Sequence, residues 1–312
     1  MKAWLLDEPR TPLRLADVPT PEPGPGQVLV KVHGAGLCHS DVAYYEGTFP
    51  FQVPLPVILG HEVSGEVVAL GEGVTGFAVG DRVASAPSAM DAPGISRDGG
   101  YAEYTLLTAS KTITFPDTVP WAQASAATDD GLTSYSGVVE HGGAKPGDRI
   151  GVVGLGGLGL TGARIGVLSG ATVYGVEPRE DVWAIATKNG VTQVVADVAE
   201  YAGQDFDAVI DFAGFDSTIT GSLRAVKPGG TVVVVGLGGD AVTLNPMELV
   251  SRNVGLRGST PSGNPEHLRA LLDWVASEDL HLEVTEINFA DIPDGLARLG
   301  RGEVKGRLVA VS

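Results

Sequence analysis

The stretch Ile150-Gly-Val-Val-Gly154-Leu-Gly156-Gly-Leu-Gly159 decides how the second half of this chain folds. Residues 150–153 are apolar, as in a buried strand, residues 158–168 have a helical pattern, and a second strand pattern follows at residues 172–176. Strand, glycine-rich turn, helix and strand in this order predict a βαβ unit, with its two strands parallel in one sheet.

Further strand patterns extend this unit toward the C-terminus. They lie at residues 193–195, 208–211 and 231–235, with helical stretches before or after them. Residues 232–235 are apolar on both faces, which is typical of a central strand covered by helices. The predicted fold class is therefore α/β, with a Rossmann doubly wound parallel sheet in this half of the chain.

The first hundred residues have the pattern of short antiparallel strands joined by long loops. Residues 27–33 alternate between apolar and polar side chains, and residues 62–70 form a second β-rich run. We interpret Gly34 and Gly36, which lie between these runs, as turn residues. A helix at residues 265–276 and a short αβ tail are predicted at the end of the chain.

The composition excludes several classes of partner. The chain has 312 residues, with 21 lysines and arginines against 38 acidic residues and a formal net charge of −17, so nucleic acid and anionic membrane surfaces would repel it. Eight glycines between residues 150 and 170 argue against a membrane span there. The single cysteine, Cys38, and an amino end without a signal-peptide pattern predict a reducing, cytoplasmic location.

The glycine motif carries the first functional signal. Gly154 permits a tight turn, Gly156 lets the backbone approach a pyrophosphate at a helix N-terminus, and Gly159 lets helix and strand pack closely. A carboxylate at Glu177, at the end of the second strand, can accept hydrogen bonds from ribose hydroxyls and favours NAD, although the neighbouring Arg179 leaves NADP open. The residues predicted here to bind the dinucleotide are Gly154, Gly156, Gly157, Gly159, Glu177 and Arg179.

A second signal lies in the β-rich half. Gly36-Leu-Cys38-His39-Ser40-Asp41 follows one strand, and Gly60-His61-Glu62 opens another. A soft thiolate, an imidazole and a carboxylate in one small lobe suit zinc.

These two stretches, with others along almost the whole chain, resemble the zinc-dependent alcohol dehydrogenases of the medium-chain dehydrogenase/reductase superfamily. The other matching stretches are Gly71 to Val83, Asp98-Gly-Gly-Tyr-Ala-Glu-Tyr104, the glycine motif, Lys227-Pro-Gly-Gly230 and Gly302 to Arg307. The resemblance implies a GroES-like catalytic domain of residues 1–127 and 262–312 and a Rossmann domain of residues 128–261. It also implies transfer of hydride between a small alcohol and NAD, with an aldehyde or ketone as product.

The resemblance also implies roles for single residues at the zinc site. Cys38 and His61 match zinc ligands, and Glu62 matches an acid that approaches the metal. The third ligand of the family is often a second cysteine, but some relatives carry an aspartate there, and Asp129 matches it, with Asp130 as the neighbour that could be confused with it. Because Glu62 adjoins His61 in a strand, we expect their side chains to point to opposite faces.

Further roles follow from the same resemblance. Ser40 matches the residue that takes the proton of the alcohol, and His39 and Arg307 match positions that approach the cofactor pyrophosphate. Aromatic residues after the metal loop are predicted to line the substrate pocket: Tyr44, Tyr45, Phe49 and Phe51.

Two departures from the family pattern carry predictions. Residues 84–94 form a short segment without cysteines, where many relatives hold a structural zinc with four cysteines, so one zinc per chain is expected. Ala43 stands where many relatives have a proton-relay histidine, so the last step of the proton route stays unassigned.

Two other functions compete with this reading: a zinc-free quinone or enoyl reductase on the same scaffold, and a non-catalytic dinucleotide-binding protein. The trio Cys38, His61 and Asp129 speaks against the reductase, which does not need it. The chain is expected to form a homodimer or homotetramer, since residues 254–258 have the pattern of an edge strand that could pair with its symmetry mate.

Overall fold

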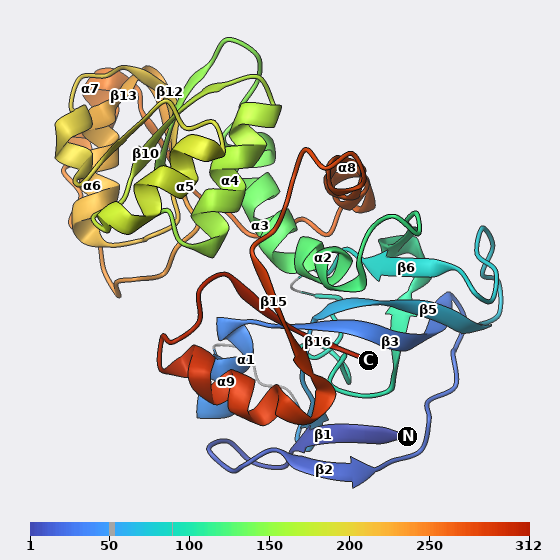
Figure 1. Ribbon diagram of the computed structural model, residues 1–312. Helices are drawn as coiled ribbons and strands as arrows, with labels where there is room; N and C mark the ends of the chain where they lie inside the picture. The colour runs from blue at the N-terminus through green and yellow to red at the C-terminus, as the bar shows by residue number, and fades with distance from the viewer. Residues whose placement is uncertain (50–53, 89) are drawn as a thin grey trace. The chain divides into compact units, whose positions relative to one another are not determined.

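The chain forms two compact units in the computed structural model, which describes residues 1–49, 54–88 and 90–312 (Figure 1). Unit 1 comprises Met1–Leu132 and Pro261–Ser312, and unit 2 comprises Thr133–Thr260. The sequence placed the two boundaries after residues 127 and 261. The structure therefore puts Asp129 in unit 1, together with Cys38 and His61.

Unit 2 is a six-stranded sheet in which all the strand pairs are parallel, in the order β11-β10-β9-β12-β13-β14. The chain starts at β9, moves outward to β11 and returns to the other side of β9 with β12, so the strand order reverses beside β9. Such a reversal opens a crevice at the carboxyl ends of the strands. The strands are β9 (Arg149–Val153), β10 (Thr172–Val176), β11 (Gln193–Val195), β12 (Phe206–Asp211), β13 (Val226–Val234) and β14 (Gly255–Gly258).

Helices cover both faces of this sheet, with α4 and α5 on one face and α6 and α7 on the other (Figure 1). Their bounds are α4 (Gly157–Leu168), α5 (Trp183–Lys188), α6 (Asp216–Ala225) and α7 (Pro246–Arg252). Two short helical segments, α3 (Leu132–Tyr135) and the π-helical η3 (Ser136–His141), lead into the unit. The predicted doubly wound parallel sheet is confirmed.

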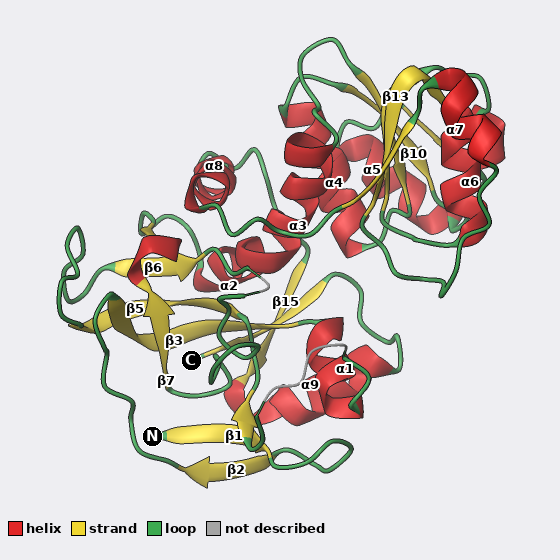
Figure 2. Cartoon of the chain, turned by 180° about the vertical axis from the view of Figure 1, so that it is seen from behind, coloured by secondary structure: helices red, strands yellow, loops and turns green. Residues whose placement is uncertain are grey.

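Unit 1 is built mainly from strands, as Figure 2 shows. Its larger, seven-stranded sheet has the order β15-β16-β3-β5-β6-β8, with β7 paired to β3. The strands are β3 (Gln27–Leu37), β5 (Glu62–Leu70), β6 (Arg82–Ser85), β7 (Tyr104–Thr108), β8 (Thr112–Thr114), β15 (Val284–Asn288) and β16 (Arg307–Val311). A three-stranded sheet has the order β2 (Arg14–Asp17), β1 (Lys2–Leu6) and β4 (Val57–Ile58).

The helices of unit 1 lie around these sheets. They are α1 (His39–Glu46), α2 (Trp121–Ala126), the π-helical η2 (Ala127–Gly131), α8 (Pro265–Ala276) and α9 (Ile292–Gly300). Short 3₁₀ turns complete both units: η1 (Ala109–Lys111), η4 (Glu180–Val182), η5 (Val198–Tyr201) and η6 (Phe289–Asp291). None of the helices in the described ranges is long and apolar enough to cross a membrane.

The prediction that Gly34 and Gly36 form a turn is wrong, because β3 continues through both of them to Leu37. A Cβ on Gly34 would lie 2.5 Å from Oγ of Ser64, and one on Gly36 would lie 1.9 Å from Oε2 of Glu62. These glycines make room for side chains of the neighbouring strand. The extension of β3 carries the chain directly to Cys38.

Candidate active site

Four potential metal ligands converge within unit 1. One ligand atom each of Cys38, His61, Glu62 and Asp129 lies within 4.8 Å of all the others. Cys38 stands between β3 and α1, His61 directly precedes β5, and Asp129 lies in the π-helical turn η2. The structure thus brings together residues from three separate stretches that the sequence proposed as one zinc site.

The expectation that His61 and Glu62 point to opposite faces is wrong. Both contribute to the same cluster, because His61 lies outside the strand and the strand alternation begins only at Glu62. Gly60 has a φ of +94°, a left-handed conformation that turns the chain just before His61.

Asp41 holds two of the ligand loops together, although no role was predicted for it from the sequence. Its carboxylate accepts hydrogen bonds from the backbone N–H of Cys38 at 2.9 Å and of Gly60 at 3.3 Å, and its Oδ1 lies 3.4 Å from Nδ1 of His61. Burial alone would lower the pKa of His61, but Asp41 and Asp129 raise it well above its usual value. A sequence signal existed, since Asp41 stands three residues after Cys38, where the acid of a helix capping box stands.

Arg307 is the cation of the cluster. Its guanidinium lies 3.2 Å from carboxylate oxygens of both Glu62 and Asp129 and 3.8 Å from Oδ1 of Asp130. Burial opposes ionisation of Asp129, but a hydrogen bond with His61 and the charge of Arg307 hold its pKa well below the usual range. Burial raises the pKa of Glu62 by more than Arg307 lowers it. The structure places Arg307 among these acids, and its contact with a pyrophosphate stays a prediction.

The cluster fits a tetrahedral zinc ion. Ligands bound to zinc at about 2.0–2.3 Å lie roughly 3.3–3.7 Å apart, and Nε2 of His61 is 3.8 Å from Oδ2 of Asp129. Within the described residues, the buried carboxylate oxygens of Glu62 have no hydrogen-bond partner. A thiol, an imidazole and two carboxylates therefore lie together, and this set of sulfur, nitrogen and oxygen donors suits a divalent cation such as zinc.

The glycine-rich turn of unit 2 has the geometry that its sequence requires. Gly154 has a φ of +81°, and a Cβ on Gly159 would lie 1.7 Å from the carbonyl oxygen of Gly154. A Cβ on Gly156 would meet no heavy atom within 4 Å. Gly154 and Gly159 are therefore needed by the fold, whereas Gly156 leaves open space beside the first turn of α4, which begins at Gly157.

Glu177 is fixed directly beside this turn. Its Oε2 accepts a hydrogen bond from the backbone N–H of Leu155 at 3.0 Å, and its Oε1 lies 2.9 Å from Nε of Arg179. Although burial opposes the effect, the hydrogen bonds from Arg179 and Leu155 lower the pKa of Glu177. The carboxylate predicted to bind a ribose is therefore ionised at neutral pH.

Comparison with known proteins assigns the family. Residues 24–117 match the family described as alcohol dehydrogenase GroES-like domain, and residues 157–277 match that described as zinc-binding dehydrogenase. The chain is 30% identical to an alcohol dehydrogenase of Moraxella sp. (strain TAE123), over 99% of this chain and 98% of that protein. The chain belongs to the zinc-binding alcohol dehydrogenase family. An NAD-dependent alcohol dehydrogenase of Sulfurisphaera tokodaii is 33% identical over 82% of this chain and 86% of its own length.

Solved structures of this family share the fold. The alcohol dehydrogenase of Aeropyrum pernix superposes with a TM-score of 0.88 at 29% identity, covering 100% of both chains. Acetophenone reductase from Geotrichum candidum, solved in complex with NAD, gives a TM-score of 0.88 at 30% identity, covering 100% of this chain and 97% of its own. The predicted family, fold and NAD-dependent class of enzyme are confirmed.

Two more predicted residues of this dehydrogenase lie beside Cys38. The Cys38 thiol donates a long hydrogen bond to Oγ of Ser40, with the two atoms 3.7 Å apart, so the Ser40 hydroxyl stands next to one of the four potential ligands. His39 begins α1, and burial and the charge of Arg307 lower its pKa. An uncharged imidazole at this position could contact a cofactor pyrophosphate only through a neutral N–H donor.

The aromatic residues predicted to line one pocket point in different directions. Tyr44 is buried and stacks on Phe49, with ring centroids 4.0 Å apart. Tyr45 instead lines a cavity of about 410 Å³ between α1 and α9, with Leu296 among its neighbours. Phe51 lies outside the described residues.

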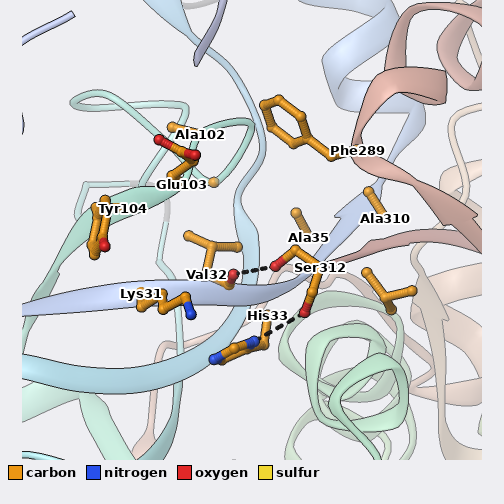
Figure 3. A pocket seen from close by; sticks show the side chains of 12 residues that line it. Lys31, Val32, His33, Ala35, Ala102, Glu103, Tyr104, Phe289, Ala310 and Ser312 are labelled. Atoms are coloured by element: carbon orange, nitrogen blue, oxygen red, sulfur yellow. Dashed lines mark hydrogen bonds between the residues drawn. The ribbon is translucent and has the colours of Figure 1, made fainter. Parts of the chain in front are cut away.

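A separate cavity of about 330 Å³ lies beside the middle of β3, at residues 31–35 (Figure 3). Phe289 and Ala102 are among its apolar lining residues, and the C-terminal Ser312 closes one side, where its carbonyl oxygen lies 3.0 Å from Nδ1 of His33. The lining includes none of the predicted site residues. This cavity is therefore distinct from the metal cluster.

The segment without cysteines is held by a polar contact. The Asp91 carboxylate accepts hydrogen bonds from Arg97 and, at 3.1 Å, from Oγ1 of Thr108. This network ties the segment to β7.

Proposed function

We propose that this protein is an NAD-dependent alcohol dehydrogenase that holds one zinc ion through Cys38, His61 and Asp129. The observation that carries the proposal is the convergence of these three side chains with Glu62 inside one unit. Membership of the zinc-binding alcohol dehydrogenase family supports it independently.

Glu62 is the fourth member of the cluster, and we assign it a role other than that of permanent ligand. Its Oε1 lies 3.2 Å from Arg307, and its Oε2 lies over Gly36, where no Cβ could fit. These contacts hold the carboxylate beside the ligands. From there it can approach the metal without being one of its three fixed ligands.

A zinc ion at this site, when bound, supplies Lewis acidity that lowers the pKa of a substrate hydroxyl. The protein's own residues orient the ligands and handle the proton. Asp41 faces Nδ1 of His61 and so leaves Nε2 directed toward Asp129. Oγ of Ser40 is the atom that we propose takes the proton of the alcohol, because it lies beside the ligand Cys38.

A kinetic screen combined with metal analysis tests this function. Primary, secondary, aromatic and polyol alcohols are assayed with NAD, and zinc is measured in the same preparation. We expect turnover of at least one alcohol class and about one zinc per chain. Turnover of quinones or enoyl substrates without zinc would support the reductase instead, and bound nucleotide without metal or turnover would support a non-catalytic binding protein.

The same analysis tests the absence of a structural zinc. A closed structural site needs four ligands, and residues 84–94 have no cysteine. Two tightly held zinc ions per chain would overturn this part of the proposal.

We also propose that the enzyme is a homo-oligomer, most simply a twofold dimer. β14 is one of the two edge strands of the sheet in unit 2, and all four of its residues are exposed. Exposed apolar side chains stand on the same unit, with Val250 in α7 77% exposed and Leu256 in β14 36% exposed. Pairing of β14 with its symmetry mate would satisfy the free strand edge. A monomeric mass by light scattering at micromolar concentration would overturn this proposal.

We place the enzyme in the cytoplasm, where its single thiol would stay reduced. Cys38 is needed as a ligand in its thiolate form, and an oxidising compartment would expose it to modification. Cell fractionation with an antibody against the chain tests this location.

A further inference from the structure

The motif Asp98-Gly-Gly-Tyr-Ala-Glu-Tyr104 has no role in the site described so far, yet it reaches the metal cluster. Tyr101 is fully buried, and its ring lies against Gly60, where a Cβ would be only 2.5 Å from Cδ1 of the ring. The backbone of Tyr101 donates to the carbonyl of Leu59 at 3.0 Å, and Gly100 donates to that of Gly60 at 2.7 Å. Tyr101 is therefore fixed beside the residues that lead into His61.

The hydroxyl of Tyr101 is directed at Asp41. It lies 2.9 Å from Oδ2 of that carboxylate and 3.3 Å from the carbonyl oxygen of Gly36. Burial raises the pKa of Tyr101 well above its usual value, so the phenol keeps its proton and acts as a donor. Of the two acceptors, the charged and closer oxygen of Asp41 forms the stronger hydrogen bond.

The Tyr101 hydroxyl completes the set of hydrogen bonds that the Asp41 carboxylate accepts. Oδ2 accepts from Tyr101 and from the backbone of Cys38, while Oδ1 accepts from the backbone of Gly60 and faces His61. Without the phenol, Oδ2 would keep only the Cys38 N–H, and the carboxylate could rotate about its χ2 bond. Rotation would move Oδ1 away from Nδ1 of His61.

We infer that Tyr101 is a positioning residue of the metal centre, whose hydroxyl fixes the Asp41 carboxylate that orients His61. The inference rests on the proposed zinc site and adds to it a residue that does not touch the metal but acts on His61 through Asp41. A group that orients a ligand raises metal affinity because the ligand then loses less freedom on binding.

The test compares zinc affinities. Wild-type protein and the variants Tyr101→Phe and Tyr104→Phe are titrated against a competing chelator. Tyr104 belongs to the same motif but lies in β7, where it lines the separate cavity of Figure 3. We expect Tyr101→Phe to bind zinc about tenfold more weakly, at the lower end of the effect of an outer-shell partner, and Tyr104→Phe to match wild type. Equal affinity of all three proteins would overturn the inference.

A double-variant cycle separates positioning from general destabilisation. If Tyr101 acts through Asp41, then Asp41→Asn combined with Tyr101→Phe should bind zinc within about twofold of Asp41→Asn alone. Additive losses would overturn the inference, as would a lower Tm for the apoprotein of Tyr101→Phe with unchanged zinc affinity. Failure of wild type to bind zinc would instead overturn the proposed function, on which this inference rests.

Discussion

The cluster of candidate metal ligands and the glycine-rich turn are built on opposite principles. The cluster uses side chains from distant parts of the sequence, and Cys38, His61, Asp129 and Arg307 meet only in the folded unit. The turn uses backbone from six consecutive residues, Gly154 to Gly159, and its glycines matter through the side chains that they lack. The cluster should therefore respond to a change of chemical group, and the turn to added volume.

Because of its buried charges, the cluster should be more sensitive to substitution of a side chain than the turn is. Glu62, Asp129 and Asp130 all lie within 3.8 Å of Arg307, so removal of one acid leaves the others to rearrange around a buried cation. Beside the turn stands the carboxylate of Glu177, whose partners are the backbone N–H groups of Leu155 and Arg179 and the largely exposed guanidinium of Arg179. The largest effects are therefore expected in the cluster.

The largest effect is expected from removal of the proposed third ligand. Asp129→Ala should lose zinc and lower turnover by about 10⁴-fold or more, because the metal supplies several kcal/mol of catalysis and each 1.36 kcal/mol is about tenfold in rate. Zinc content and kcat are measured on the same preparation. Asp130→Ala is the matched control, and it should retain zinc because Asp130 lies outside the ligand cluster.

The two variants also test the register of this segment. If Asp130→Ala loses zinc and Asp129→Ala retains it, the third ligand is Asp130 and the proposed register is wrong by one residue. Retention of zinc in both would transfer the role to Glu62, the remaining carboxylate of the cluster.

Replacement of a neighbouring group that is not a ligand should separate chemistry from metal binding. Ser40→Ala should lower kcat by roughly 10²- to 10⁴-fold, the effect of a positioned proton-transfer group, while zinc content stays at the wild-type value. Unchanged kcat would show that the proton leaves by a route that does not use Ser40.

The sequence predicted the turn more completely than the cluster, for a physical reason. A βαβ turn is encoded locally, so Gly154, Gly159 and Glu177 could be placed from spacing alone, and the helix at residues 265–276 was predicted with its observed bounds. Asp41 and Tyr101 are 60 residues apart in the sequence, and their hydrogen bond forms only in the folded unit.

Glycines limited the prediction of secondary structure, because a glycine can either form a turn or make room for a neighbouring side chain within a strand. Gly34 and Gly36 have the composition of a turn, but they lie within β3 because side chains of β5 occupy the space of their missing Cβ atoms. Gly60 has the reverse effect, since its positive φ interrupts the expected alternation and brings His61 and Glu62 to one site.

Two alanine substitutions in the turn should separate an effect on protein stability from an effect on NAD binding. Gly159→Ala should destabilise the protein by about 1–3 kcal/mol, because its Cβ would overlap the Gly154 carbonyl and force the backbone to shift. Gly156→Ala should leave Tm unchanged but weaken NAD binding by about tenfold or more, since the space that its Cβ fills is the space predicted for the pyrophosphate.

Thermal unfolding and NAD titration of both variants distinguish these effects. An unchanged Kd for NAD in Gly156→Ala would show that the cofactor does not approach this glycine. A Tm for Gly159→Ala equal to that of wild type would show that the turn can relax around the extra methyl group.

The smallest expected effect concerns the choice between NAD and NADP. Glu177 is ionised and fixed by Leu155 and Arg179, so a 2′-phosphate placed at this carboxylate would meet a like charge. The wild-type ratio of kcat/KM for NAD to that for NADP should therefore exceed one, and Glu177→Gln should lower it by about tenfold, equivalent to about 1.4 kcal/mol. Arg179→Ala should move the ratio in the opposite direction, because it removes the cation that partly neutralises Glu177 and could pair with the phosphate. A wild-type preference for NADP would mean that attraction of the 2′-phosphate by Arg179 outweighs its repulsion by Glu177.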